Sequence, residues 1–427
     1  MELPAMVTPS NSAPNYSDTS TLIPAPVNYE PPPYRYKYQK QRNKIRKDST
    51  SLAFYDFWIL AISTCLGKYN PFSHLADPSR DTIWLFDSIA FQDISGAWKA
   101  EVTAAYFYKD SGQEVTNTAA DIALDIGLHD FGDEQSREET RNTMTERLQL
   151  FLDIIAPSTT VNIDFPNGSQ QLQPAGSNGI SCQVLSVPRR PPVIDTPTIK
   201  FEVMDFPPSV SMDVYYNDPW GWTVVSDIDD SIKVTETPST LGVLKTTFAL
   251  PFTPVPGMPQ LYNHIQQVFS PSWLYLSASP YNLYPVLRPF IFQFYPKGQI
   301  ILRDNNWMAL DDLYTTLTEG TQEFKEKRLY KIHSWIPGRN IICIGDSTQS
   351  DPETYAAVYR KHPTWIKGIF IRRVNGFWDN PEERQKKNST DRFQEAFKDI
   401  PRELWKVFDE PTELYADMVR LKASVVI

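Results

Sequence analysis

Residues 223–233 read TVVSDIDDSIK. An apolar run suited to a buried strand passes directly into Asp227, Asp229 and Asp230, all within one turn. In a parallel α/β sheet, functional sites form at the carboxyl ends of the strands. Three carboxylates at such an end repel one another unless they share a proton or a cation, and magnesium (Mg²⁺) is the usual partner of such oxygen ligands. An acidic surface turn is the plainer interpretation of this segment taken alone.

A second acidic cluster lies in residues 340–351, NIICIGDSTQSD, where an apolar strand ends at Asp346 and Asp351 follows five positions later. Between the two clusters come Ser277, at the end of the apolar run WLYLS, and Lys325, in the helical pattern FKEKRLYKI. A strand-end hydroxyl and a lysine are suitable donors to phosphate oxygens. Two strand-end carboxylate clusters in one sheet predict the two halves of a metal site.

The surrounding pattern predicts two kinds of domain. Between 81 and 221 strand patterns dominate, which predicts a β-sandwich-like domain with a helical insertion. From 222 to 375 short apolar runs alternate with helical patterns, which predicts a parallel sheet flanked by helices. A polar tail, 376–427, is predicted to be helical. The predicted strands are 82–86, 99–108, 160–165, 181–187, 199–204, 211–216, 223–226, 273–276, 299–302, 341–344 and 368–371, and the inserted helices are 114–127 and 134–155.

Charge is unevenly distributed along the chain. The 427 residues carry a formal charge of −10, which argues against a general nucleic-acid binder. The first 50 residues, however, carry a net +3, because seven basic residues and no acidic one fall between 35 and 47, and the remainder carries −13. Residues 1–48, rich in Pro, Ser, Thr and Asn, are predicted to be a disordered, Pro-rich and basic arm.

Residues 49–80 are predicted to hold an amphipathic helix and a linker. The apolar segment 52–66 is shorter than the roughly 20 residues that a membrane-spanning helix needs. It is either a helix docked on the core or an interfacial helix that acts with the basic arm at a membrane surface. Three scattered cysteines and the lack of a signal-peptide pattern favour a cytoplasmic location.

The arm contains Pro31-Pro32-Pro33-Tyr34. A PPxY tetrapeptide fits the grooves of WW domains, because a pre-extended polyproline segment binds them at low entropic cost. An ordinary Pro-rich tail explains the same residues equally well. The sequence therefore leaves two alternatives: either these residues bind a WW-domain protein, or they bind no partner.

The order DxDx[T/V], strand-end Ser or Thr, Lys, GDxxxxD resembles the pattern of the haloacid-dehalogenase-like phosphohydrolases. The segments SDIDDSIK, GMPQLY, YLSASPYNLYP, PKGQIILRD and IGDSTQSDPETY further resemble the fungal actin-patch phosphatidate phosphatase family, whose core is similar to that of the lipins. The resemblance covers residues 222–374 closely. It implies a haloacid-dehalogenase-like Rossmannoid sheet over 222–375. It also implies magnesium-dependent hydrolysis of phosphatidate to diacylglycerol and phosphate, in the cytoplasm or peripherally at membranes and cortical actin patches during endocytosis.

The resemblance also implies roles for individual residues. Asp227 would form an aspartyl-phosphate, and Asp229 would protonate the leaving alkoxide and then deprotonate water. Ser277 and Lys325 would clamp the phosphoryl group. The metal ligands would be Asp227, Asp229 through its backbone carbonyl, Asp346 and Asp351, although Asp351 could instead hold Lys325.

Some positions depart from the family pattern or leave a choice open. Ser231 stands where the motif usually has Thr and keeps the hydroxyl, so it remains a substrate-binding candidate. Lys233 either faces substrate or is a solvated loop residue. Thr348 stands where relatives usually carry Gly, and a positive φ there would strain a β-branched residue. Lys325 is preferred to its neighbours Lys327 and Lys331.

Two other functions remain open from the sequence. The phosphatase could act on a soluble phosphomonoester or a phosphoprotein instead of a lipid. Alternatively, the chain could be an interaction protein of endocytic sites, with the Pro-rich arm as its working part and the catalytic centre secondary.

Overall fold

The computed structural model of the chain describes residues 73–112, 116, 134–166, 168–190, 198–304 and 320–425. The basic arm at 1–48, the apolar helix predicted at 52–66 and nearly all of the helix predicted at 114–127 lie outside these residues, so they stay predictions. Within the described part of the chain, no helix has both the length and the apolar character needed to cross a membrane.

The C-terminal half forms a six-stranded sheet in which every neighbouring pair is parallel. The strand order is β13-β12-β11-β14-β15-β16, so the chain builds outward from β11 in one direction and then returns to pair β14 on its other side. A reversal of this kind leaves a crevice at the carboxyl ends of the two central strands. The bounds are β11 Trp222–Ser226, β12 Ser272–Pro280, β13 Gln299–Arg303, β14 Asn340–Asp346, β15 Ile366–Arg372 and β16 Trp405–Phe408.

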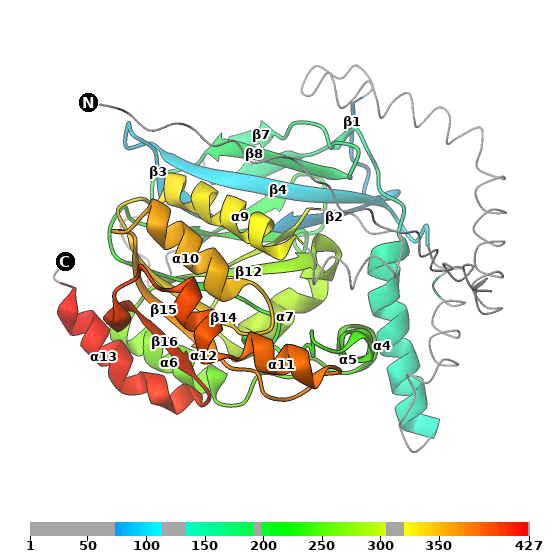
Figure 1. Cartoon of the computed structure of the whole chain (residues 1–427). Helices are drawn as coiled ribbons and strands as arrows, with labels where there is room; N and C mark the ends of the chain where they lie inside the picture. Colours follow the sequence, from blue (N-terminus) through cyan, green and yellow to red (C-terminus); the bar gives the residue numbers. More distant parts are fainter. Residues whose placement is uncertain are drawn as a thin grey trace, which may run out of the picture. The chain divides into compact units, whose positions relative to one another are not determined.

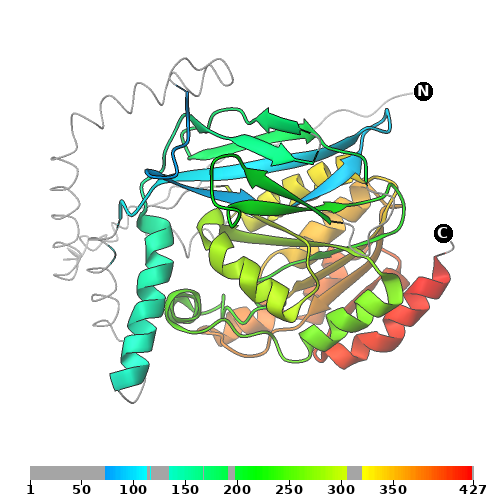
Figure 2. The same cartoon turned by 180° about the vertical axis from the view of Figure 1, so that it is seen from behind.

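Helices cover both faces of this sheet (Figures 1 and 2). Successive strand residues point to opposite sides. Val225 and Cys343 therefore pack in the core beneath α9 and α10, while Val224 and Ile342 pack in the core beneath α6 and α7. Strands buried on both faces need continuous apolar runs, which is the pattern in the sequence. The bounds are α6 Met258–Phe269, α7 Tyr284–Phe294, α9 Thr321–Trp335, α10 Asp351–Lys361 and α13 Tyr415–Ser424.

The predicted helical tail is wrong at its centre, because Trp405–Phe408 forms β16 and extends the parallel sheet. The strand reads WKVF and is held by pairing with β15, a long-range contact that a four-residue apolar run within a polar tail does not reveal. The flanking segments are helical as expected, with α11 at Pro381–Lys387 and α12 at Thr390–Ala396.

Eight of the N-terminal strands form one hydrogen-bonded sheet, and the short strands β1 and β5 form a separate parallel pair. The eleven-residue β4 pairs with β2 and β3 on one edge and with β8 on the other. From β3 the sheet continues through β10, β9, β6 and β7 and curves so that Val102 of β4 and Phe201 of β9 share one core. The bounds are β1 His74–Leu75, β2 Asp81–Phe86, β3 Ser88–Gln92, β4 Trp98–Tyr108, β5 Thr159–Thr160, β6 Asn162–Phe165, β7 Gly168–Gln171, β8 Ile180–Ser186, β9 Thr198–Val203 and β10 Ser211–Tyr216.

The predicted insertion is the helix α4, Glu134–Leu152, which packs on the catalytic half (Figure 2). Its buried Leu148 belongs to the same core as Phe248, in the segment that follows β11. Arg147 donates hydrogen bonds to the carbonyls of Thr247 and Leu250, each 2.8 Å long. The helix therefore supports the long loop that leaves the central strand.

Ion pairs and hydrogen bonds join the N-terminal sheet to the catalytic half. The guanidinium of Arg288, in α7, lies 2.6 Å from the Asp87 carboxylate and 2.9 Å from that of Asp213. The backbone amide of Asp87 donates to the Tyr284 hydroxyl at 2.7 Å. Burial raises the pKa of Asp87 despite this arginine. Because Asp87 is almost fully buried, this contact fixes the N-terminal sheet against the β13 side of the catalytic sheet.

Candidate active site

The two acidic clusters meet at the reversal of strand order. Asp227 directly follows β11 and Asp346 ends β14, and the Asp227 amide donates to the Ile344 carbonyl at 2.8 Å. Both carboxylates are buried, with 1% and 0% of the residue exposed. Parallel pairing in register thus brings together residues that are more than a hundred positions apart.

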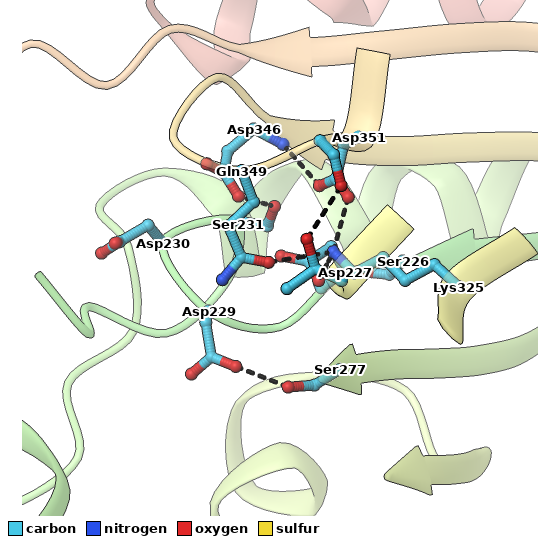
Figure 3. A network of polar contacts seen from close by, with 12 residues as sticks. Ser226, Asp227, Asp229, Asp230, Ser231, Ser277, Lys325, Asp346, Gln349 and Asp351 are labelled. Carbon is cyan, nitrogen blue, oxygen red and sulfur yellow. Dashed lines mark hydrogen bonds and ion pairs between the residues drawn. The ribbon is translucent and has the colours of Figure 1, made fainter. Parts of the chain in front are cut away.

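Lys325 reaches this point from α9 (Figure 3). Its ammonium donates to Asp227 Oδ1 at 2.6 Å, to Asp351 Oδ1 at 2.5 Å and to Gln349 Oε1 at 3.4 Å. Its side chain is completely buried. Burial opposes the charge, but the carboxylates of Asp227 and Asp351 outweigh it and raise the pKa of Lys325. The structure therefore places Asp351 against Lys325.

The two other candidate lysines lie elsewhere. Lys327 is exposed and pairs with Glu323 at 2.6 Å, one turn earlier on the same helix. Lys331 pairs with Glu101 of β4. Helical geometry separates the three, because Lys325 lies on the buried face of α9 with Leu329 and Ile332.

A compact group of carboxylates surrounds Lys325. One oxygen each from Asp227, Asp346 and Asp351 lies within 4.8 Å of the others. Burial, and then the charge of Asp351, raises the pKa of both Asp227 and Asp346. Within the described residues, Asp227 Oδ2 is buried and has no hydrogen-bond partner. An orphaned buried oxygen among repelling carboxylates is the environment that a hard divalent cation satisfies, so these residues could hold one.

Asp346 and Asp351 are held by short contacts. Asp346 accepts from the amide of Thr348 at 2.6 Å, from its hydroxyl at 2.5 Å and from Ser231 Oγ at 3.0 Å. The second oxygen of Asp351 accepts from the Asp346 amide at 3.1 Å. Ser231 thus touches the Asp346 carboxylate directly. Thr348 is not among the residues with positive φ, so the strain expected of it does not arise.

Asp229 points away from this group toward β12 (Figure 3). Its carboxylate accepts from Ser277 Oγ at 2.5 Å, from Ser279 Oγ at 2.9 Å and from Thr235 Oγ1 at 2.8 Å. Burial alone would raise the pKa of Asp229, but the nearby Lys233 ammonium and these hydroxyls outweigh it and lower the pKa. The structure thus brings Ser277 to Asp229, and the predicted clamping of the phosphoryl group by Ser277 and Lys325 stays a prediction.

Lys233 is buried, so the solvated-loop interpretation of this residue is wrong. Its ammonium donates to Thr235 Oγ1 at 2.6 Å and lies 3.6 Å from Asp229 Oδ1. It also lies 4.8 Å from the centre of the Phe252 ring. Burial lowers the pKa of Lys233, although Asp229 and Asp230 oppose this shift. In this structure Lys233 thus contacts protein groups around Asp229, the second aspartate of the DxD motif.

The sequence predicts Asp230 only as the third carboxylate of the first acidic cluster, whereas in the structure it organises the loop after β11. It takes a left-handed conformation, with φ of 56°, and its carboxylate accepts from the amides of Thr235, Glu236 and Thr237 at 2.7–2.9 Å. Arg372 donates to its carbonyl, at 2.9 Å through Nε. Its signal in the sequence was the third acid of DIDD followed by a Thr-x-Thr. Ser279 and Gln349 were also missed, and neither belongs to the motif pattern.

This geometry lies within a recognised catalytic domain. Residues 222–373 match the family described as phosphatidate phosphatase APP1, catalytic domain. This part of the chain is therefore similar to the catalytic domain of that family. The phosphatidate phosphatase APP1 of Saccharomyces cerevisiae is 26% identical over 251 residues, which is 55% of this chain and 41% of the yeast protein.

An uncharacterized protein of Schizosaccharomyces pombe is 29% identical over 159 residues, which is 36% of this chain and 25% of that protein. The matches thus span less than half the length of both curated relatives.

Proposed function

We propose that this chain is a magnesium-dependent phosphatidate phosphatase with a haloacid-dehalogenase-like core, which releases diacylglycerol and phosphate. The observation that carries the proposal is the Asp227–Lys325–Asp351 cluster, with Asp346 beside it, at the reversal of a parallel sheet. That cluster lies inside the segment that matches the catalytic domain of the phosphatidate phosphatase APP1 family. The lipid substrate in this proposal comes from the name of that family.

Asp227 is the nucleophile in this proposal. A carboxylate oxygen of Asp227 attacks phosphorus, and the bond to the lipid oxygen breaks with its electron pair leaving on that oxygen. The product is an aspartyl-phosphate, which water then hydrolyses to free phosphate and regenerated Asp227. Lys325 favours the ionised form of Asp227, because its ammonium lies 2.6 Å from Oδ1.

Asp229 is the general acid and the general base in this proposal. It gives a proton to the leaving lipid oxygen and later takes one from the attacking water. The Lys233 ammonium and three hydroxyls keep its pKa low, which suits the resting, ionised state. A bound phosphate dianion raises the pKa of a neighbouring carboxyl, which is the change that the acid step needs. Ser277, Ser279 and Thr235 orient the carboxylate between these steps.

The residues fit magnesium, because Asp227 presents an orphaned buried oxygen and Asp346 lies within reach of it. Asp227 and Asp346 would hold the ion with the backbone carbonyl of Asp229. Asp351 already carries the Lys325 ammonium and the Asp346 amide, so its first role is to position both. The ion would supply Lewis-acid stabilisation of charge on the transferred phosphoryl group.

The test is hydrolysis of phosphatidate in mixed micelles, with magnesium and with a chelator. We expect turnover that requires magnesium and that Asp227→Asn abolishes. Turnover that persists in Asp227→Asn would reject the assigned nucleophile. A preference for p-nitrophenyl phosphate over micellar phosphatidate would favour the soluble-substrate alternative.

Location and partners belong to the same proposal and rest on the sequence alone. They comprise a cytoplasmic chain, peripheral contact with membranes at cortical actin patches, and a WW-domain partner at Pro31–Tyr34. These N-terminal residues lie outside the described part of the chain. Binding to an isolated WW domain that is unchanged in Tyr34→Ala would remove the partner from the proposal.

A further inference from the structure

The segment that joins α11 to α12 is fastened to the loop that carries the second acidic cluster. Arg392 donates through Nη1 to the carbonyls of Lys387 at 2.7 Å and Ser347 at 2.6 Å, and through Nη2 to the Gln349 carbonyl at 2.6 Å. Its guanidinium also pairs with Glu353 of α10, with Nε 2.8 Å from the carboxylate. One arginine thus fixes the end of α11 against the loop between Asp346 and Asp351.

A second contact holds the same segment. Asn388 donates through Nδ2 to the Val374 carbonyl at 2.8 Å, just beyond the end of β15. The backbone at Lys387 is therefore tied to the carboxyl ends of both β14 and β15. This is the edge of the sheet at which Asp227 and Asp346 meet.

Lys387 is the last residue of α11 and its side chain is half-buried, whereas its neighbour Lys386 is exposed. Within the described residues, the Lys387 ammonium has no hydrogen bond and no ion pair. Its electrostatic neighbours are Arg392, which repels it, and the carboxylates of Glu353, Glu383 and Asp346, which attract it. Burial, and then Arg392, lowers the pKa of Lys387.

An ammonium that is partly withdrawn from water and has no partner in the protein loses solvation without a compensating contact, and an anionic ligand would supply that contact. The other cations at this edge are already committed. Lys325 is bonded to Asp227 and Asp351, Lys233 faces Asp229, and Arg392 is bonded to carbonyls and Glu353. Of these four cations, Lys387 alone has no hydrogen bond or ion pair within the described residues, so it is available to bind an anion.

We propose that Lys387 binds the phosphoryl oxygens of the substrate at the mouth of the active site, as a specificity residue for dianionic phosphomonoesters. The proposal rests on the function proposed above and adds a residue that lies beyond the matched catalytic segment. A phosphoryl group at Asp227 and Asp346 is an anion within the field of this ammonium. Lys387 therefore strengthens binding of the phosphoryl group, and Arg392 positions it.

The experiment compares Lys387→Gln, Lys387→Arg and the matched control Lys386→Gln, an exposed neighbour on the same helix. Steady-state kinetics are measured with p-nitrophenyl phosphate and with phosphatidate in mixed micelles, and inorganic phosphate serves as a competitive inhibitor. We expect Lys387→Gln to raise KM for both substrates, and the inhibition constant of phosphate, by about 10- to 100-fold, the range for one charge-assisted hydrogen bond. The value of kcat changes less, Lys387→Arg recovers most of the loss, and Lys386→Gln matches the wild type.

An unchanged KM and phosphate inhibition constant in Lys387→Gln would overturn the proposal. So would an effect confined to phosphatidate, because the ammonium would then face the lipid surface and not the phosphoryl group. If the wild type hydrolyses neither substrate, the proposed function fails separately. Calorimetric titration with inorganic phosphate then tests the proposed role of Lys387. Weaker phosphate binding by Lys387→Gln than by the wild type supports the contact, and equal binding or no binding rejects it.

Discussion

Removing the charge of Lys325 should destabilise the fold as well as stop the chemistry. Lys325→Met leaves the carboxylates of Asp227 and Asp351 buried without the ammonium that now lies 2.6 and 2.5 Å from them. Breaking a buried pair in this way costs about 3–5 kcal/mol, because the remaining charge is uncompensated. The matched control is Lys327→Met on the same helix, whose ion pair is exposed and whose loss should change the unfolding free energy by less than about 0.5 kcal/mol.

The pH dependence of this loss gives a second test. Asp227 already has a raised pKa, and loss of Lys325 raises it further, because desolvation and Asp351 then act without opposition. A carboxyl whose folded pKa is raised stabilises the fold most below its unfolded pKa and loses that contribution as pH rises through the folded value. The deficit of Lys325→Met should therefore be larger at pH 8 than at pH 5.5.

The assay is urea unfolding followed by fluorescence, with a chelator present so that no metal contributes. Adding Asp351→Asn to Lys325→Met should recover part of the stability, since one uncompensated charge is removed. A deficit that is equal at both pH values, or no larger than that of Lys327→Met, would refute the electrostatic account of the cluster.

Three further predictions follow from other contacts. Asp346→Asn should raise the magnesium concentration needed for half-maximal phosphatase rate, as a magnesium titration would show, and an unshifted titration would remove Asp346 from the ligands. Arg147→Met removes two buried 2.8 Å hydrogen bonds and should lower the unfolding free energy by about 2–4 kcal/mol in urea, whereas a neutral result would mean that α4 does not support its loop. Burial lowers the pKa of both His333 and His362, whose rings stack 3.6 Å apart. The stability that the neutral pair contributes is present above pH 6.5 and is lost as pH falls. The unfolding free energy of His362→Phe, measured in urea, should therefore fall less than that of the wild type between pH 7.5 and 5.5. An equal fall would contradict this account of the pair.

The sequence by itself determined the local parts of the catalytic half. Apolar runs too continuous for a half-exposed sheet predicted β11, β12, β13, β14 and β15. Each was found within about two residues of its expected bounds, except that β12 continues to Pro280, so Ser277 lies inside the strand and not at its end. The acids at the ends of β11 and β14 could be selected because parallel strands end at a common edge, whatever their order. The helical spacing of Lys325, Leu329 and Ile332 was also a local property, and it selected the lysine that the structure places against Asp227 and Asp351.

Only the tertiary structure decided which of these groups meet. No local sequence pattern encodes the distances between elements. These distances place Asp351 against Lys325 and Ser277 against Asp229. The strand β16 forms because β15 offers it an edge, and α4 joins the core that lies beneath the segment after β11. Periodicity reports which face of an element is buried, whereas strand order and the partner of each face are set by the summed packing of the whole chain.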